Sequence, residues 1–195
     1  MYYLKVRNYA VLFLFFGWML CSIGCASDSA TSTDAKADTP KAFFDIDGYF
    51  DAEINALNSS TLKLKKDAKI DGKSESQTIE KPNWNTELKL FKDSDINKAA
   101  WVDKYNAEKK SNSIVYTTAD STLTTKRIQI DYKSTVTDNF EDVTSILIIN
   151  NTENVLYSSS EFLTYTPKSS ISIIRNQRIK TGENKMVEIK GMIVK

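Results

Sequence analysis

The first strongly periodic stretch of the chain spans residues 43–57. Its apolar positions lie three or four residues apart: Phe43, Ile46, Phe50, Ile54 and Leu57. This spacing predicts an amphipathic helix, because it places all five side chains on one helix face. Asp45 or Asp47 is placed to accept hydrogen bonds from the first free amides of that helix.

A second amphipathic helix is expected after Pro82-Asn83. Trp84, Leu88 and Phe91 would share one face of it. Proline is favoured in the first helical turn because its missing amide hydrogen would have no partner there. We expect this face to pack on the same core as the first helix.

Between the two helices the pattern changes to that of strands. Leu62 and Leu64 alternate with polar residues, which is the period of a strand. Asp71-Gly72 is typical of a two-residue hairpin turn in which both residues take positive φ. The sequence therefore predicts a hairpin whose return strand spans residues 73–80.

The second half of the chain is a series of short strands. They are expected at 113–118, 124–133, 143–149, 155–165, 170–179 and 186–194, with turns at Asn150-Asn151, Pro167-Lys168 and 181–184. Short connections favour pairing of consecutive strands in an antiparallel meander. The predicted fold class is α+β, with two amphipathic helices packed on a curved, mostly antiparallel meander sheet.

The N-terminal residues have the pattern of an export signal. Lys5 and Arg7 precede a nearly unbroken apolar run over residues 9–20. The following Ser22-Ile23-Gly24-Cys25 resembles the lipobox of bacterial lipoproteins, which signal peptidase II cleaves before the cysteine. The resemblance implies that Cys25 carries the lipid. The alternative is an uncleaved anchor over residues 9–26, and both place the rest of the chain on the same side of the membrane.

This resemblance defines a domain organisation. Residues 1–24 are the expected signal peptide, 25–42 the lipidated cysteine and a flexible tether, and 43–195 a single α+β domain. A small separate lobe over residues 43–109 is the alternative. In lipoproteins of this kind, the absence of aspartate after the cysteine favours the outer membrane, and here Ala26 follows Cys25. The expected location is thus membrane-anchored, facing the periplasm or the cell surface.

Composition excludes several chemistries. The chain contains no histidine, so histidine-based acid–base catalysis and histidine metal ligation are excluded. Its only two cysteines are Cys21 and Cys25. If Cys21 is removed with the signal peptide and Cys25 carries the lipid, thiol catalysis and cysteine metal ligation are excluded as well. Without Lys5 and Arg7 the 26 basic residues become 24, against 25 acidic ones. This balance gives no electrostatic case for nucleic acid. We expect no cofactor and no metal.

Two short motifs invite catalytic interpretations. Phe43 to Gly48 contains Asp-x-Asp-Gly after apolar residues and resembles the first motif of haloacid-dehalogenase-type phosphatases. The apolar residues around it recur at helical spacing, however, so Asp45 is interpreted as a helix cap. Ser60 and Lys63 have the Ser-x-x-Lys spacing of penicillin-binding enzymes, but strand alternation would send them to opposite faces.

The sequence therefore favours a non-enzymatic protein. The folded part resembles small envelope lipoproteins with α+β domains, which implies a membrane-tethered binding or assembly module for an envelope protein or another envelope component. The alternative is a carrier or receptor of an apolar ligand such as lipid, held in a half-barrel cavity. A hydrolase that uses only carboxylates is a third hypothesis.

Overall fold

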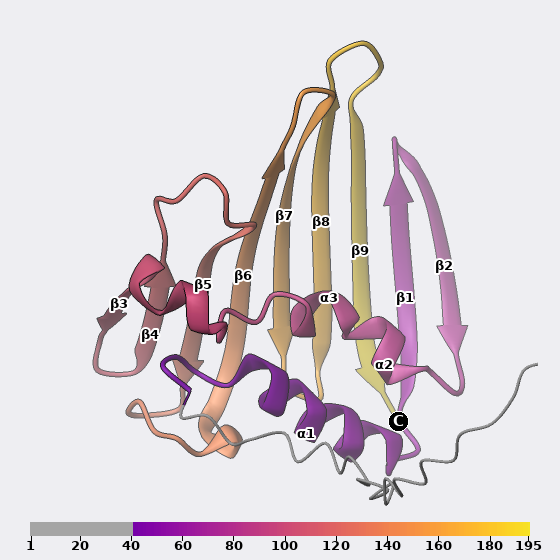
Figure 1. Ribbon diagram of the computed structural model, residues 1–195. Helices are drawn as coiled ribbons and strands as arrows, with labels where there is room; N and C mark the ends of the chain where they lie inside the picture. The colour runs from indigo at the N-terminus through magenta and orange to yellow at the C-terminus, as the bar shows by residue number, and fades with distance from the viewer. Residues whose placement is uncertain (1–40) are drawn as a thin grey trace, which may run out of the picture. The chain divides into compact units, whose positions relative to one another are not determined.

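The computed structural model describes residues 41–195, which belong to one compact unit. The predicted signal peptide, the lipidation site at Cys25 and all of the predicted tether except its last two residues lie outside the described residues. The described part is of the α+β class, with an open antiparallel sheet as its dominant feature (Figure 1).

Nine strands of the described chain form one sheet in the order β2-β1-β9-β8-β7-β6-β5-β4-β3. Their bounds are β1 Lys63–Ile70, β2 Lys73–Ile79, β3 Asn106–Lys109, β4 Ser113–Thr117, β5 Thr125–Tyr132, β6 Val143–Glu153, β7 Tyr157–Thr166, β8 Ser170–Ile179 and β9 Lys185–Val194. From β3 to β9 neighbours in the chain are neighbours in the sheet, so the predicted meander is confirmed. The β1–β2 hairpin joins the last strand, because β1 pairs with β9 from Lys63 to Ile70.

The predicted first helix is confirmed as α1, Ile46–Asn58, except that Phe43, which was expected on its apolar face, lies before its start. Asp45 is its N-cap, and its carboxylate accepts a 2.7 Å hydrogen bond from the backbone N–H of Gly48. The helix ends at Ser59, whose N–H donates to the carbonyl of Asn55. Asp45 therefore caps a helix, as its position in the apolar pattern predicts.

The expected second helix is instead two four-residue helices, α2 Trp84–Glu87 and α3 Lys89–Lys92. The chain leaves helical geometry at Leu88, where φ is −100° and ψ is 2°. Trp84, Leu88 and Phe91 are all buried. Phe91 N–H donates to the carbonyl of Leu88, three residues back, so the chain tightens at the point where three large side chains enter the core.

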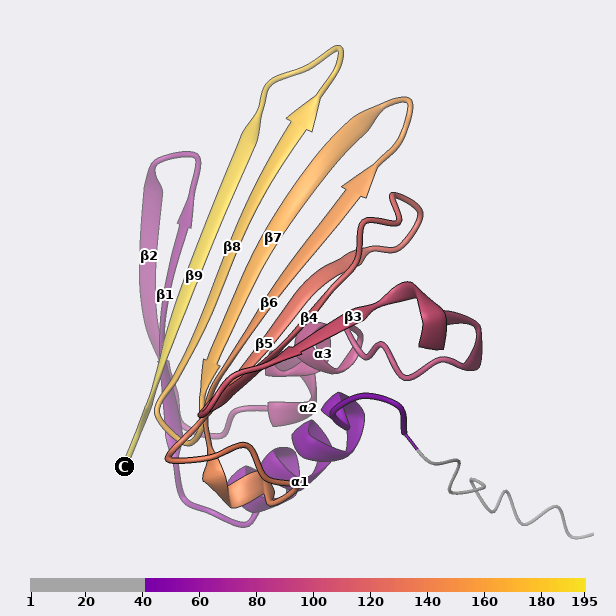
Figure 2. The same cartoon turned by 90° about the vertical axis from the view of Figure 1, so that its left-hand side faces the viewer.

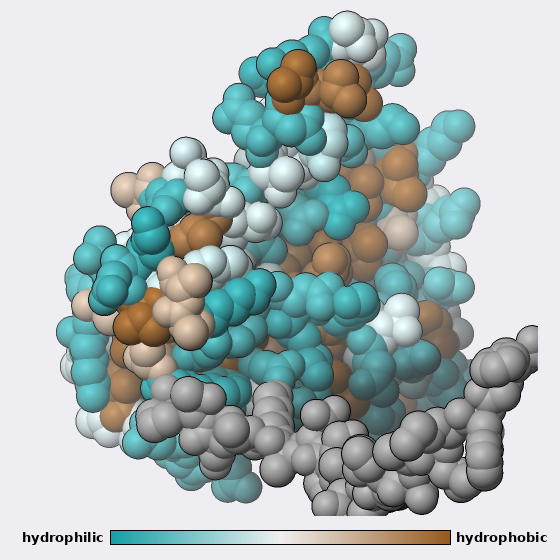
Figure 3. Space-filling model, in the orientation of Figure 1, coloured by the Kyte–Doolittle hydropathy of each residue, from teal (hydrophilic) through white to brown (hydrophobic). Residues whose placement is uncertain are grey.

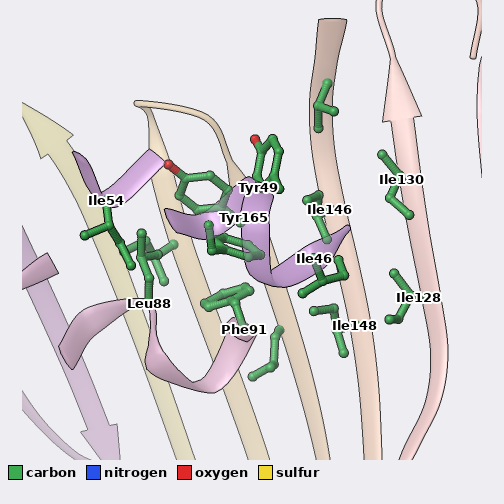
Figure 4. Packing of buried hydrophobic residues seen from close by; sticks show 14 of the residues in the cluster. Ile46, Tyr49, Ile54, Leu88, Phe91, Ile128, Ile130, Ile146, Ile148 and Tyr165 are labelled. Atoms are coloured by element: carbon green, nitrogen blue, oxygen red, sulfur yellow. The ribbon is translucent and has the colours of Figure 1, made fainter. Parts of the chain in front are cut away.

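The helices lie on one face of the sheet (Figure 2). Successive side chains of a strand point to opposite faces, and the buried members of β5, β6 and β7 face the helices. In the core, residues of α1 and α3 lie against residues of these strands: Ile46, Tyr49, Phe50, Phe91, Ile128, Ile130, Ile146, Ile148, Leu163 and Tyr165. Figure 4 shows this packing around Tyr49, Phe91 and Tyr165. The helices cover only one half of this face, and the strands extend beyond them.

The predicted turn at Asn150-Asn151 is wrong, because β6 continues to Glu153. Asn150 is 7% exposed and donates a 2.9 Å hydrogen bond to Ser94 Oγ. A buried partner thus holds this asparagine within the strand, and the chain turns at residues 154–156 instead. The predicted 71–72 hairpin is confirmed, with φ of 48° at Asp71 and 86° at Gly72.

The sequence pattern also missed three short elements. They are the edge strand β3 and two 3₁₀ helices, η1 Ala99–Lys104 and η2 Phe140–Asp142. All four residues of β3 are exposed, so no apolar alternation marks this strand in the sequence. Segment 43–109 contributes β1 and β2 to one edge of the sheet and β3 to the other.

Candidate functional site

Three hairpin turns gather at the end of the sheet that the helices leave uncovered (Figure 1). They are residues 71–72, 154–156 and 180–184, which join β1 to β2, β6 to β7 and β8 to β9. We call this the distal end. The described chain begins at the opposite, helix-covered end, beside α1.

A groove of about 510 Å³ lies at the distal end. Register places Ser160, Asn176 and Met186 side by side across three strands, and Ser158 lies opposite Arg178 two residues further along the same face. The even-numbered residues of β7 point away from the helices, since Leu163 and Tyr165 face them. The groove therefore opens mainly on the bare face of the sheet. Its lining is polar apart from Met186: Asp71, Ser158, Ser160, Asn176, Gln177, Arg178, Asn184, Lys185 and Met186.

Most polar side chains of this groove have no partner within the described chain. Among residues 41–195, the side chains of Ser160, Asn176, Arg178 and Lys185 make no hydrogen bond or ion pair. Asp71 differs, because its carboxylate accepts a 3.0 Å hydrogen bond from the N–H of Met186. The groove thus offers hydroxyl, amide, guanidinium and ammonium groups to a ligand from outside the domain.

Exposed apolar side chains also lie at the distal end. Val155 is 81% and Leu156 70% exposed, and Figure 3 shows apolar groups at the top of the molecule. The turn that carries them is ordered by hydrogen bonds. Asn154 Oδ1 accepts from the N–H groups of Leu156 at 2.8 Å and Tyr157 at 2.9 Å, and the Leu156 carbonyl accepts from Lys180 N–H at 3.0 Å. The backbone therefore holds two apolar side chains out in solvent.

A second cleft, of about 480 Å³, lies beside α1 and includes Glu53, Lys133, Phe140 and Lys168 in its lining. The hydroxyl of Tyr165 donates a 2.5 Å hydrogen bond to Glu53 at this place. Burial, followed by the nearby Glu53 carboxylate, raises the pKa of Tyr165 well above its ordinary value. The phenol therefore stays protonated and acts as a hydrogen-bond donor, not as a base or nucleophile.

Tyr49 lies next to this pair in the core. Its side chain is 1% exposed, and its hydroxyl has no hydrogen-bond partner among residues 41–195. Burial and then Glu53 raise the pKa of Tyr49 as well. Neither phenol is activated as a base or nucleophile, so this cluster contributes to packing of the core.

Acidic residues in the first half of α1 form ion pairs with a lysine of α3. Lys92 of α3 lies 3.3 Å from Asp47 and also pairs with Asp51. The hydrogen bond from Lys92 to Asp51 is the main cause of a raised lysine pKa. Within residues 41–195, no group of three histidine, cysteine or acidic side chains is arranged to hold a metal ion. Asp45 and Asp47 thus serve the helix end and the contact between helices.

The Ser60–Lys63 motif is also divided between structural contacts. Ser60 Oγ donates to the Leu57 carbonyl at 2.6 Å, and Lys63 pairs with Glu80 at 2.7 Å. Cys25, the predicted lipidation site, lies outside the described residues. Between residues 41 and 195, no helix has the length and apolar character needed to cross a bilayer.

No protein-family model matches this chain, and no curated protein or solved structure does so either. The candidate site therefore rests on geometry: a helix-covered half of the sheet with a filled core, and a distal end with a polar groove and an apolar turn. Sequence reasoning missed the distal site because Val155 and Leu156 continue the apolar pattern of the next strand. The available signal was Asn154, whose side chain favours a turn.

Proposed function

We propose that this protein is a membrane-tethered, non-enzymatic module of the bacterial cell envelope that binds through the distal end of its sheet. The lipid at Cys25 is its membrane anchor, as the lipobox resemblance implies, and the outer membrane is its favoured location. The helical layer is proposed to pack on a curved sheet and to keep the binding end rigid. Rigid presentation lowers the entropy lost when a partner binds.

One observation carries the binding proposal. The space between helices and sheet is filled by side chains, among them Tyr49, Phe50, Phe91 and Tyr165, each at most 1% exposed. Unpartnered polar groups gather instead in the open distal groove. A filled interior and an outward-facing site favour an interaction module over a carrier, which requires an apolar cavity of roughly 300–1,000 Å³.

Lipid counting separates the module from the carrier. The full chain is purified from membranes in mild detergent, and extractable lipid per chain is measured by mass spectrometry. The module predicts no stoichiometric lipid beyond that covalently bound at Cys25. One tightly held lipid per chain would establish the carrier in its place.

Site-specific photo-cross-linking tests the groove itself. A photoreactive residue at position 176 of the full chain should give a discrete adduct in intact cells. The matched position 190 lies on the same bare face of the neighbouring strand and outside the groove, and it should give none. Equal adducts from both positions would contradict a site at the groove.

Lipidation at Cys25 is tested separately. Cys25→Ser should prevent incorporation of a fatty-acid probe and should leave an uncleaved precursor, because the modified thiol is removed. Cys21→Ser is the matched control and should leave labelling unchanged. Continued labelling of Cys25→Ser would remove the lipoprotein part of the proposal.

A further inference from the structure

The turn at residues 154–156, which we call the distal tip, is built to expose apolar groups. A free loop would fold Val155 and Leu156 back onto the sheet, since each buried CH₂ contributes about 0.8 kcal/mol. Here Asn154 accepts two backbone hydrogen bonds and Lys180 ties down the Leu156 carbonyl. Neighbouring apolar side chains that an ordered backbone holds outward are typical of an interaction site.

Chemical character changes in layers below the distal tip. Tyr157 pairs with Ile179 in the first row, and Ser158 pairs with Arg178 in the second. Two residues of a strand span about 7 Å, so the guanidinium row begins about 7 Å below Leu156. A bilayer surface has the same order: an apolar boundary, a layer where tyrosine is enriched, and a phosphate layer.

We propose that the distal tip inserts into the surface of a phospholipid bilayer. Val155 and Leu156 enter the boundary of the acyl chains, Tyr157 lies at the interface, and Arg178 binds a headgroup phosphate. Arg178 is available for this contact, because it has no carboxylate partner among residues 41–195. The inference rests on the proposed tethered module, since two apolar side chains bind a membrane weakly and the tether supplies the necessary local concentration.

Size and shape favour lipid over a protein partner. A stable protein interface buries about 800 Å² on each partner, whereas the distal tip offers two convex apolar side chains. A bilayer accommodates such a tip without a complementary pocket. The charges beside it are mixed, with Arg178 and Lys180 against Glu153 and Glu183. The contact should therefore depend on apolar insertion and respond weakly to salt.

Chain length allows this contact in the membrane that carries the anchor. Fifteen residues, 26–40, lie between the predicted lipid and the described domain, and their fully extended length is about 50 Å. The ten residues of β7 span about 33 Å. The distal tip can therefore reach the anchoring bilayer when the domain tilts.

The test uses the full chain anchored in vesicles of phosphatidylethanolamine and phosphatidylglycerol. Leu156→Trp places a fluorophore at the distal tip, and Val102→Trp is the matched control at a 46% exposed apolar site on η1. Lipids brominated near the headgroup end of the acyl chain should quench the added fluorescence at position 156 and spare that at position 102. Val155→Asp in the Leu156→Trp chain should weaken the quenching about tenfold, because a charge must enter the interface.

The outcomes separate this inference from the function on which it rests. If the chain floats with the vesicles but its tryptophan at 156 stays fully accessible to iodide, the insertion is overturned and the tether remains intact. A chain that does not float at all would overturn both. Unchanged quenching in the Val155→Asp chain would also overturn the inference, since the apolar tip would then be irrelevant to the contact.

Discussion

At the scale of single residues, two neighbouring buried phenols differ in their hydrogen bonding. The Tyr165 hydroxyl donates to Glu53 at 2.5 Å, whereas the Tyr49 hydroxyl is buried without a partner in the described chain. A hydrogen bond to a charged group contributes about 1.5–3 kcal/mol, and an unsatisfied buried hydroxyl costs about 1–3 kcal/mol. Removing the two hydroxyls should therefore have opposite consequences.

We predict that Tyr165→Phe lowers the free energy of unfolding by about 1.5–3 kcal/mol. Tyr49→Phe, the matched change, should leave it unchanged or raise it by about 1 kcal/mol, because it removes a desolvated group and keeps the ring packed. Urea denaturation followed by circular dichroism measures both. Equal losses in the two variants would show that Tyr49 has a partner after all.

Buried phenols also predict an alkaline limit to stability. Burial raises the pKa of Tyr105 and of Tyr132 to about 12, whereas unfolded tyrosine titrates near about 10. Their contribution is complete below about pH 10, where both states are protonated. Above that, only the unfolded state loses its protons, so stability falls as pH rises through about 12.

The measurement is the urea midpoint at about pH 8 and about pH 11.5. We expect a clear drop for the wild type and a smaller one for Tyr105→Phe, which cannot ionise. A midpoint that does not change with pH would contradict the burial of these phenols.

At the scale of elements, backbone conformation decides which substitutions are tolerated. Gly72 has a φ of 86°, and a Cβ built there meets no atom within 4 Å. Backbone strain is therefore the only penalty. Gly72→Val should lower the free energy of unfolding by at least about 1–2 kcal/mol, because a β-branched residue strongly disfavours positive φ.

Gly72→Asn is the matched control, since asparagine tolerates the left-handed region. Its loss should be well under that of Gly72→Val in the same thermal melts. Similar melting temperatures for both variants would show that strain at this turn does not limit stability.

Elements with a strong local signal could be predicted from sequence. The apolar spacing of Ile46 to Leu57 gave α1, and Asp71-Gly72 gave the hairpin. The failures have tertiary causes. A break at Leu88 lets three large side chains enter one core, and a hydrogen bond to Ser94 holds Asn150 within a strand, where its type suggested a turn. Neither cause is local to its segment.

The candidate site was less predictable than the fold. Ser158, Ser160, Asn176 and Arg178 meet only through the register of β7 and β8, and no spacing in the sequence marks that register. Val155 and Leu156 were expected in a strand because they are apolar. Their side chains point outward only because these two residues lie in the turn between β6 and β7.

At the scale of the whole described domain, the two halves of the sheet differ in cover. Helices bury the half that contains Ile148 and Leu163, both 0% exposed. In the distal half, the strands contact only their neighbouring strands, and no helix covers them. Local opening needs less free energy where fewer apolar contacts are lost.

Hydrogen exchange should therefore divide β6 and β7 along their length. Amides near Ile148 and Leu163 should exchange only through global unfolding, while those near Thr152 and Ser159 should exchange at least about tenfold faster. Mass spectrometry of peptic peptides gives this profile. Uniform protection along both strands would mean that the distal end is as rigid as the core.

The pairing of β1 with β9 sets an order of assembly. Lys63 lies opposite Val194, and Ile70 opposite Val187, so a hairpin made early can dock only when the final strand exists. A two-stranded hairpin by itself is marginally stable in water, and contacts this distant in sequence slow folding. A chain terminated before Lys185 would therefore lose three strands from the sheet, because the β1–β2 hairpin would lose β9, the strand that joins it to the other strands. The ten residues of β9 therefore determine whether the β1–β2 hairpin, which lies far earlier in the chain, becomes part of the sheet.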